Sequence, residues 1–420
     1  MIRECRLDNG LTLLTETMPQ VRSVTIGVWL RRGSRNEPAK LNGISHFIEH
    51  LVFKGTENRT AREIALSMDS VGGQIDAFTS KEYTCFYAKV LDQHIEEAVD
   101  LLADIVQRPL FDPEELERER QVVLEEIRMV EDSPDDLIYD LFASEFYPRQ
   151  TLGRPVQGTA ETVAGMSRRQ LLGFFRRSYR PEHMLVAAAG NLRHAKLAKL
   201  VRQGFEGLRP GGRAERKPAR PRPRCATVTK AKNELAQLHL LLGLPAFREN
   251  LAERYALHTL NTILGGTMSS RLFQRIREER GLAYSVYSAL NGFRDTGHMV
   301  IYAATHPSSA ADVIRLATDE LRNLRDHGPT DAELEVAREH LKGSLMLALE
   351  QTSSRMSNLA RQEIYLDRPQ SLTETLRRVS SVTAAHVHRI GREIMRDQRL
   401  GLAAIGRVRR LRLSPEALRL

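Results

Sequence analysis

Two histidines and a glutamate lie within five consecutive residues near the amino end of the sequence. His46, Glu49 and His50 form the pattern H-x-x-E-H in the segment GISHFIEHLVFKGT, residues 43–56. On a helix, positions i and i+4 lie on one face about one turn apart, so both imidazoles can reach one metal ion. Glu49 stands beside them and can act on a metal-bound water without being a ligand. The pattern therefore predicts a metal site with a neighbouring general base.

A catalytic zinc site needs three protein ligands and an open position, so a third ligand is expected elsewhere. The order H-x-x-E-H is the inverse of the H-E-x-x-H pattern of thermolysin-like zinc proteases and supports the same chemistry. Candidates for the third ligand are Glu119, Glu125 and Glu126 in the segment ERERQVVLEE. Glu119 and Glu126 share one helical stripe, so one can bind the metal while the other hydrogen-bonds a ligand. Spacing alone does not choose among the three, and such glutamates are also common on solvated helix surfaces.

Helix and strand signals surround these residues. Residues 22–30 and 82–90 are rich in β-branched and aromatic side chains in an alternating pattern, which is typical of strands. A capping-box pattern predicts a helix over 60–71 that ends at a glycine pair. An aspartate cap followed by proline predicts a long charged helix over 113–129, and a second helix begins near residue 133.

The same order of elements recurs in the second half of the sequence. A strand is expected over 237–244, a helix over 254–264 and a Gly-Gly segment after it. Strands over 283–290 and 298–305 follow, and then helices. We therefore infer a duplicated α+β unit, each copy a mostly antiparallel sheet with helices packed on one face.

A basic, proline-rich stretch separates the two halves. Residues 208–224 carry seven Lys or Arg against one acid and hold most of the chain's net charge of +9. This composition predicts an extended, self-repelling linker that serves as a hinge. The expected boundaries are an amino-terminal half at 1–207, the linker at 208–224 and a carboxyl-terminal half at 225–420. Because the linker has no interleaved aromatic residues and no recognition motif, no nucleic-acid partner is expected.

Composition narrows the class and the compartment of the protein. The 420 residues are 41% hydrophobic and 27% charged, as in folded globular proteins. Cys5, Cys85 and Cys225 are odd in number and form no C-x-x-C pair, which excludes a disulfide framework and favours a reducing compartment. No apolar run approaches the ~18 residues of a membrane span. With no signal or transit peptide in view, a cytoplasmic location is expected.

The sequence resembles the pitrilysin or insulinase family of zinc metallopeptidases, which includes mitochondrial processing peptidase and its bacterial relatives. The resemblance covers essentially the whole chain and rests on LDNGLTLLTE, HFIEHLVFKGT, GGQIDAFTSKEYT, ERERQVVLEEI and LFQRIREERGLAYSVYS, in that order. It implies two homologous halves that form a clamshell and one zinc ion per chain. The implied activity is endopeptidase cleavage of extended or unfolded peptides, of the presequence, leader or peptide-processing type.

The resemblance also implies roles for particular residues. His46 and His50 match the family's zinc ligands, and Glu126 matches its distal ligand. Glu119 matches the carboxylate that lies behind a ligand, and Glu49 matches the general base. These matches distinguish among the three glutamates that spacing leaves open.

The second half has no H-x-x-E-H, so it is expected to hold no metal and to complete the substrate site. Arg277 and Tyr284 are seven residues apart and match an Arg and a Tyr of the family. In such a site the phenol can donate to the oxyanion of a tetrahedral intermediate, and the guanidinium can bind a substrate carbonyl. From the residues alone, Tyr284 would be a core aromatic in a strand.

The segment from Gly73 to Ser80 is expected to be an exposed strand edge. An extended peptide can add to such an edge through backbone hydrogen bonds. Gly73, Asp76, Ala77 and Phe78 are the candidate substrate-binding residues. Asp76 stands where many relatives carry Asn, and a carboxylate cannot donate the hydrogen bonds of an amide.

The principal alternative is a non-catalytic partner or scaffolding subunit of a heterodimeric peptidase, because the family includes such members. The intact H-x-x-E-H and distal glutamate argue against it. The expected partners are peptide substrates and, by family analogy, a second copy or a related subunit, with no membrane partner.

Overall fold

The computed structural model describes residues 2–211, 220–396, 400–411 and 413–420. The chain divides into two compact units, and each unit is built from three stretches of sequence. Unit 1 contains Met1–Met129, Arg154–Pro218 and Met346–Ser371, and unit 2 contains Val130–Gly153, Ala219–Leu345 and Leu372–Leu420. The chain thus passes between the units at several places, of which the expected linker at 208–224 is one. Residues 212–219 of that linker lie outside the described residues.

Unit 1 contains a six-stranded sheet in the order β1-β2-β6-β3-β5-β4. Every neighbouring pair is antiparallel except β2 and β6, which are parallel. The strands expected over 22–30 and 82–90 are present as β3 and β5. The six strands are β1 (Ile2–Arg6), β2 (Thr12–Thr17), β3 (Ser23–Leu30), β4 (Gln74–Thr79), β5 (Thr84–Leu91) and β6 (Met184–Gly190).

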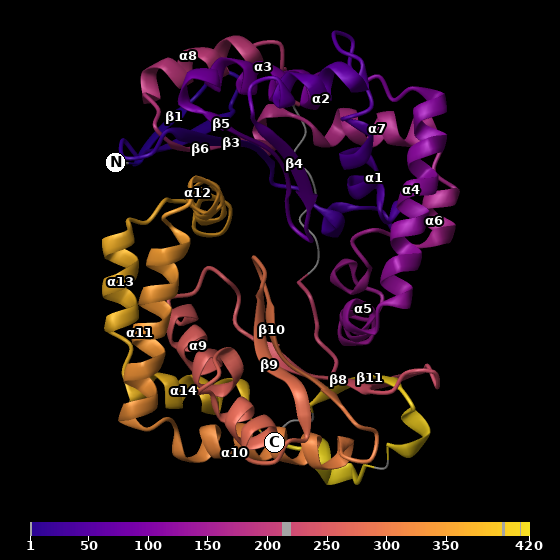
Figure 1. Cartoon of the computed structure of the whole chain (residues 1–420), viewed down its shortest axis with the longest axis vertical. Coiled ribbons are helices and arrows are strands. Elements are labelled where there is room, and N and C mark those ends of the chain that lie inside the picture. The colour runs from indigo at the N-terminus through magenta and orange to yellow at the C-terminus, as the bar shows by residue number, and fades with distance from the viewer. Residues whose placement is uncertain (1, 212–219, 397–399, 412) are drawn as a thin grey trace. The chain divides into compact units, whose positions relative to one another are not determined.

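Helices cover both faces of this sheet. On one face, apolar side chains of seven helices pack with the sheet in a single core. On the other face lies α12 (Thr352–Leu366), which contributes Met356 and Leu359 to a core with Trp29 and Leu185; Figure 1 shows it opposite α3 and α8. The seven helices are α1 (Ile44–Leu51), α2 (Ala61–Asp69), α3 (Ile95–Gln107), α4 (Pro113–Asp132), α6 (Ala160–Ala164), α7 (Arg168–Ser178) and α8 (His194–Phe205).

The helices begin where the caps predict. The Thr60 side chain accepts from the Glu63 amide at the start of α2, and the Glu63 carboxylate accepts from the Thr60 amide in return. The Asp112 carboxylate accepts from the amides of Glu114 and Glu115 at the start of α4. These local hydrogen bonds fix the two helix starts that flank the residues of interest.

Unit 2 contains a five-stranded sheet in the order β7-β11-β8-β10-β9. The strands are β7 (Thr227–Ala231), β8 (Leu238–Ala246), β9 (Ala283–Gly292), β10 (Gly297–Thr305) and β11 (Gly401–Gly406). One face packs against α9 (Arg254–Asn261), α10 (Ala310–His327), α11 (Asp331–Ala348) and α14 (Ala384–Ile394). The other face packs against α5 (Pro134–Phe146), whose Phe142 and Phe146 join a core with Leu241 and Val300.

The two sheets repeat one topology. The order β2-β6-β3-β5-β4 in unit 1 corresponds strand for strand to β7-β11-β8-β10-β9 in unit 2, and the first pair is parallel in both. The expected duplication of a mostly antiparallel α+β unit is therefore confirmed. The expectation of helices on one face alone was incomplete, because the second face of each sheet is also apolar and needs cover. In unit 1 that cover is α12, and in unit 2 it is α5.

The three cysteines are free thiols, and Cys85 is buried in β5. Within the described chain, no helix has both the length and the apolar character that crossing a membrane requires.

Candidate metal centre

Helix α1 carries the H-x-x-E-H pattern and is anchored by its apolar side chains. Phe47, Ile48 and Leu51 are buried in the core of unit 1. The N-cap residue before the helix is Gly43, which has a φ of 93°, and a Cβ there would lie 2.4 Å from the Gln157 carbonyl oxygen. Only glycine is compatible with that backbone and that approach. The core thus fixes one side of α1, and its other side carries the polar residues.

Three side chains of unit 1 converge at one point. His46 Nε2 lies 3.5 Å and His50 Nε2 lies 3.6 Å from Glu126 Oε2, which comes from α4. Among the described residues, this is the one group of three His, Cys, Asp or Glu side chains close enough to share an ion. Two imidazole nitrogens and a carboxylate oxygen are a typical donor set for catalytic zinc. The residues therefore fit a zinc ion, and the half-exposed Glu126 leaves the site open to solvent.

The neutral state of the His46 ring favours metal binding. Burial, with a smaller contribution from His50, lowers the pKa of His46 to about 4. A neutral imidazole is the form that binds a metal. The Nδ1 atom of His46 is buried and has no hydrogen-bond partner among the described residues. No side chain that the structure describes therefore orients this ring through its other nitrogen.

His50 is oriented by Glu119, the residue two turns before Glu126 on α4. Its Nδ1 lies 3.2 Å from Glu119 Oε2, and Lys54 Nζ lies 2.7 Å from the other carboxylate oxygen. Burial lowers the pKa of His50, but the hydrogen bond with Glu119 and the nearby carboxylates outweigh it and raise the pKa. Burial raises the pKa of Glu119, but the bonds with His50 and Lys54 outweigh it and lower the pKa. A carboxylate behind a histidine ligand fixes the tautomer that presents Nε2 to a metal.

Glu125 does not join this cluster. It is exposed, and its carboxylate pairs with Arg128 at 2.5 Å on the outer side of α4. Of the three glutamates that spacing left open, Glu126 faces both histidines, Glu119 lies behind one of them, and Glu125 faces solvent.

Glu49 lies beside the cluster with its carboxylate fixed by strand β4. Thr79 Oγ1 donates to Glu49 Oε2 at 2.5 Å. Burial raises the pKa of Glu49 to about 7, although the hydrogen bond from Thr79 opposes the rise. A carboxyl group with a pKa near neutrality can both accept and donate a proton, as a general acid–base must.

Three of the candidate substrate-binding residues, Asp76, Ala77 and Phe78, lie on β4, which is the edge strand of its sheet, and Gly73 directly precedes this strand. Phe78 packs on Trp29, with ring centroids 5.5 Å apart, and Ala77 packs against the core under α1. Asp76 is exposed and accepts a 3.2 Å hydrogen bond from the Tyr87 hydroxyl. A Cβ on Gly73 would lie 2.9 Å from Val90 Cγ1, so the glycine allows close packing. These side chains mostly contact other residues of the protein. The backbone edge of β4 is therefore the part of this segment that a peptide could contact.

Arg277 and Tyr284 both lie in unit 2. Tyr284 is 76% exposed on β9, which corrects the residue-based expectation of a core aromatic. The Arg277 guanidinium stacks on two rings, 4.5 Å from the centroid of Tyr284 and 4.7 Å from that of Phe273. The arginine thus limits the motion of this exposed aromatic ring.

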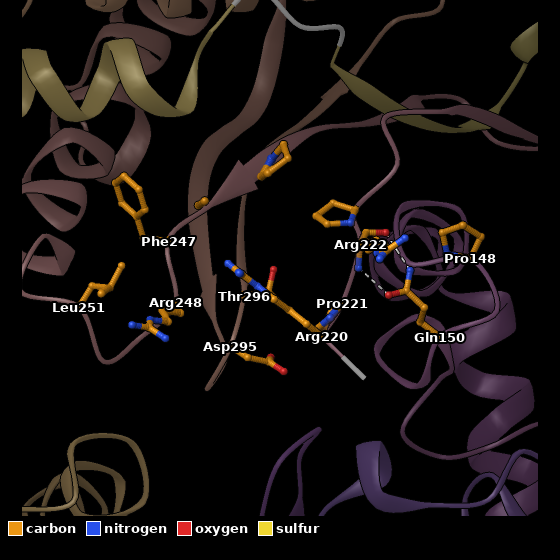
Figure 2. A pocket seen from close by; sticks show the side chains of 13 residues that line it. Pro148, Gln150, Arg220, Pro221, Arg222, Phe247, Arg248, Leu251, Asp295 and Thr296 are labelled. Atoms are coloured by element: carbon orange, nitrogen blue, oxygen red, sulfur yellow. Dashed lines mark hydrogen bonds between the residues drawn. The ribbon is translucent and has the colours of Figure 1, made fainter. Parts of the chain in front are cut away.

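A separate hollow of about 1200 Å³ lies in unit 2, beside the carboxyl end of the basic stretch (Figure 2). The Gln150 amide fixes its wall, because it both donates to the Arg222 carbonyl at 2.8 Å and accepts from the Arg222 amide at 2.7 Å. Arg220, Arg222 and Arg248 line this hollow with exposed side chains. It holds none of the three converging side chains and is therefore not the metal centre.

The sequence alone did not identify three residues whose side chains support the candidate metal centre. Lys54 had no local signal, because it lies beyond the end of α1 and pairs with Glu119 on α4. Glu37 accepts hydrogen bonds at the start of α1. Gly43 has no side chain to cap this helix, which was a hint in the sequence that another residue must do so. Thr79 had no local signal, because its contact with Glu49 joins distant elements.

Two domain families match the chain. Residues 12–160 match insulinase (peptidase family M16), and residues 165–341 match the peptidase M16 inactive domain.

Several curated relatives are similar over nearly their whole length. An uncharacterized zinc protease of Streptomyces coelicolor is 42% identical over 411 residues, which cover 96% of this chain and 89% of that protein. One of Mycobacterium tuberculosis strain H37Rv is 43% identical over 423 residues, covering 99% and 96%. The zinc protease YmxG of Bacillus subtilis is 41% identical over 397 residues, covering 94% and 96%.

Solved structures share the fold. A protease from Helicobacter pylori superposes with a TM-score of 0.91 at 23% identity, covering 96% of this chain and 99% of that one. The peptidase M16 inactive domain from Pseudomonas fluorescens gives 0.89 at 20% identity, covering 96% and 98%. With the family matches and the relatives named as zinc proteases, these findings show that the chain belongs to the insulinase family of peptidases, family M16.

Proposed function

We propose that this protein is a zinc-dependent endopeptidase that cleaves extended or unfolded peptides, with one zinc ion bound by His46, His50 and Glu126. The observation that carries the proposal is the convergence of these three side chains within 4.8 Å of one another. Support also comes from the relatives that are named zinc proteases. A non-catalytic subunit has no need of such a cluster, so its presence favours an enzyme.

The proposed base is Glu49. When bound, zinc would supply Lewis acidity that lowers the pKa of water and polarises the scissile carbonyl. Glu49 takes a proton from the attacking water on a carboxylate oxygen and transfers it to the leaving amine nitrogen as the peptide C–N bond breaks. Thr79 keeps one carboxylate oxygen occupied, so the other oxygen is directed to the proton.

Tyr284 and Arg277 are proposed to assist the reaction. The Tyr284 hydroxyl donates to the oxyanion that forms on the scissile carbonyl, and Arg277 steadies the phenol and can bind a substrate carbonyl. Both residues belong to unit 2, so these roles require that unit 2 presents them to the substrate. The exposure of Tyr284 and its stacking with Arg277 support the assignment.

The substrate class follows from the edge strand. An extended peptide can pair with β4 through backbone hydrogen bonds, a mode that requires little side-chain specificity. Folded domains cannot present such a strand, so unfolded peptides, leader sequences or presequences are the proposed substrates. Asp76, exposed on that strand, would favour substrates with a basic side chain nearby.

The proposal is tested by measuring zinc content and the cleavage of a mixed peptide library. The wild type should bind one zinc per chain, and Glu49→Gln should retain zinc while turnover falls by about 10²- to 10⁴-fold. Glu125→Gln is the matched control, because it changes an exposed glutamate of the same unit and should leave both zinc and turnover intact.

Retained cleavage by Glu49→Gln would show that the base is assigned wrongly. Neither zinc nor turnover in the wild type, even with a related subunit added, would favour the alternative of a non-catalytic partner.

A further inference from the structure

Glu37 lies outside the zinc-binding pattern but contacts the start of the helix that carries it. Its side chain is buried, with the residue 3% exposed. Oε2 accepts from the Gly43 amide at 2.7 Å and from Asn42 Nδ2 at 3.0 Å, and Oε1 accepts from the Ser45 amide at 2.8 Å. Both carboxylate oxygens are thus used at the beginning of α1.

Helix α1 cannot supply this cap from its own first residue. The N-cap position is Gly43, which has no side chain. The first amides of a helix have no partner within the helix, and a side-chain acceptor usually satisfies some of them. Glu37 fills that place from six residues earlier in the chain, and its negative charge also suits the positive end of the helix. A helix of two turns depends strongly on such support.

The segment around Glu37 is itself tightly packed. Asn42 Nδ2 also donates to the Pro155 carbonyl, and the Glu37 carbonyl accepts from Arg154. Gly158 has a φ of 83°, and a Cβ there would lie 2.4 Å from the Asn42 carbonyl oxygen. The Glu37 carboxylate is therefore attached to a rigid frame, the segment 37–42 packed against residues 154–158. Its hydrogen bonds fix the start of α1 relative to this frame.

The two histidines depend on this frame to different degrees. His50 is oriented through its Nδ1 by Glu119 on α4. Within the described part of the chain, His46 has no hydrogen-bond partner on Nδ1, and it lies in the first turn of α1, immediately after the Ser45 amide that Glu37 binds. The backbone at the start of α1 is thus what places the His46 ring.

We infer that Glu37 is a positioning residue for the metal centre, which fixes His46 by capping the first turn of α1. The inference rests on the proposed function, because it takes His46 as a zinc ligand. Glu37 does to His46 through the backbone what Glu119 does to His50 through a direct hydrogen bond. Loss of such supporting contacts costs about 10- to 100-fold in metal affinity.

The test is the zinc affinity of Glu37→Gln, measured by competition with a chelator of known affinity. Glutamine keeps one acceptor oxygen but places an NH₂ group where the other accepted, so the cap is broken with little change of shape. The dissociation constant for zinc should rise by about 10- to 100-fold. The absorption spectrum of the cobalt-substituted protein should also change, because the ligand geometry changes.

Asp104→Asn is the matched control. Asp104 is also a buried carboxylate of unit 1 with several hydrogen bonds, but its partners are Thr56, Asn58 and Arg59. Both variants should lower the melting temperature, and only Glu37→Gln should weaken zinc binding and alter the cobalt spectrum. Raising free zinc should restore the activity of Glu37→Gln toward the wild-type value.

Unchanged zinc affinity in Glu37→Gln would overturn the inference, as would equal loss of affinity in Asp104→Asn. His46→Ala separates this from the proposed function: if that variant binds zinc like the wild type, the metal centre itself is misassigned. If Glu37→Gln does not fold, Asn42→Ala replaces it, because it removes the amide that donates to Glu37. That variant should weaken zinc binding in the same direction by a smaller factor, and unchanged affinity would overturn the inference.

Discussion

The hydrogen bond from Thr79 to Glu49 offers a sharp test of how the proposed base is positioned. It is 2.5 Å long and is the one hydrogen bond that Glu49 receives from side chains of the described residues. Thr79→Val replaces the hydroxyl with a methyl group and keeps the β-branched shape that strands favour. The three proposed zinc ligands, none of which contacts Thr79 by a hydrogen bond in the described chain, are left in place.

The size of the effect follows from the kind of hydrogen bond that is lost. A hydrogen bond to a charged group contributes about 1.5–3 kcal/mol, and each 1.4 kcal/mol lost from the transition state lowers the rate about tenfold. We therefore expect kcat to fall by about 10- to 100-fold. Zinc content should remain that of the wild type, because Glu49 is not among the three ligands.

The assay measures kcat, KM and bound zinc for the wild type, Thr79→Val and Thr25→Val. Thr25 is a buried strand threonine of the same unit, and its hydroxyl is hydrogen-bonded to Thr352 at 2.8 Å. Both variants should lose a similar amount of free energy of unfolding, and only Thr79→Val should lose kcat. Equal kcat in all three proteins would refute the reasoning, and loss of zinc from Thr79→Val would show that Thr79 supports the metal centre as a whole.

Three further predictions follow from the same structure. Glu126→Gln should lose zinc to a chelator far more readily than Glu125→Gln; equal retention would mean that the third ligand lies elsewhere. Tyr284→Phe should lower kcat and keep both zinc and melting temperature, because the ring is 76% exposed; a fall in zinc would assign it a structural role. Phe142→Ala should lower the free energy of unfolding by about 3–5 kcal/mol, because it leaves a cavity between α5 and its sheet. Met346→Ala, at a side chain that is 51% exposed, should change it by less than about 0.5 kcal/mol, and similar losses in denaturant titrations would contradict the packing argument.

The prediction of the candidate metal centre rested on patterns that span only a few residues of sequence. His46 and His50 come together because α1 is helical and the i and i+4 positions share a face. The cap at Asp112 likewise predicted the helix that carries Glu119 and Glu126. In each case the decisive information lies within a few residues in the sequence, where helix geometry is reliable.

The contacts that tune the centre could not be predicted in this way. Thr79 reaches Glu49 across 30 residues of sequence, and Glu119 reaches His50 across 69. Such contacts depend on how a strand and two helices pack, which no local periodicity specifies. The choice among the three glutamates required the three-dimensional position of α4 or the family resemblance, because all three sit on the same charged helix.

The helices on the second face of each sheet show the same limit. The apolar stripes of α5 and α12 indicate that one face of each helix is buried, but they do not indicate which sheet covers it. Sequence order would assign α5 to the first half and α12 to the second. The structure instead assigns α5 to unit 2 and α12 to unit 1.

This assignment has a consequence for how the polypeptide is made. Unit 1 has all six strands once β6 is synthesised, yet α12 emerges from the ribosome only after β7, β8, β9 and β10. Until then the nascent chain carries an apolar sheet face, including Trp29 and Leu185, that its own later residues must cover. Exposed surface of this kind favours aggregation and chaperone binding during synthesis. A polypeptide cut within residues 208–224 should therefore yield two insoluble pieces that recover a fold only when they are refolded together.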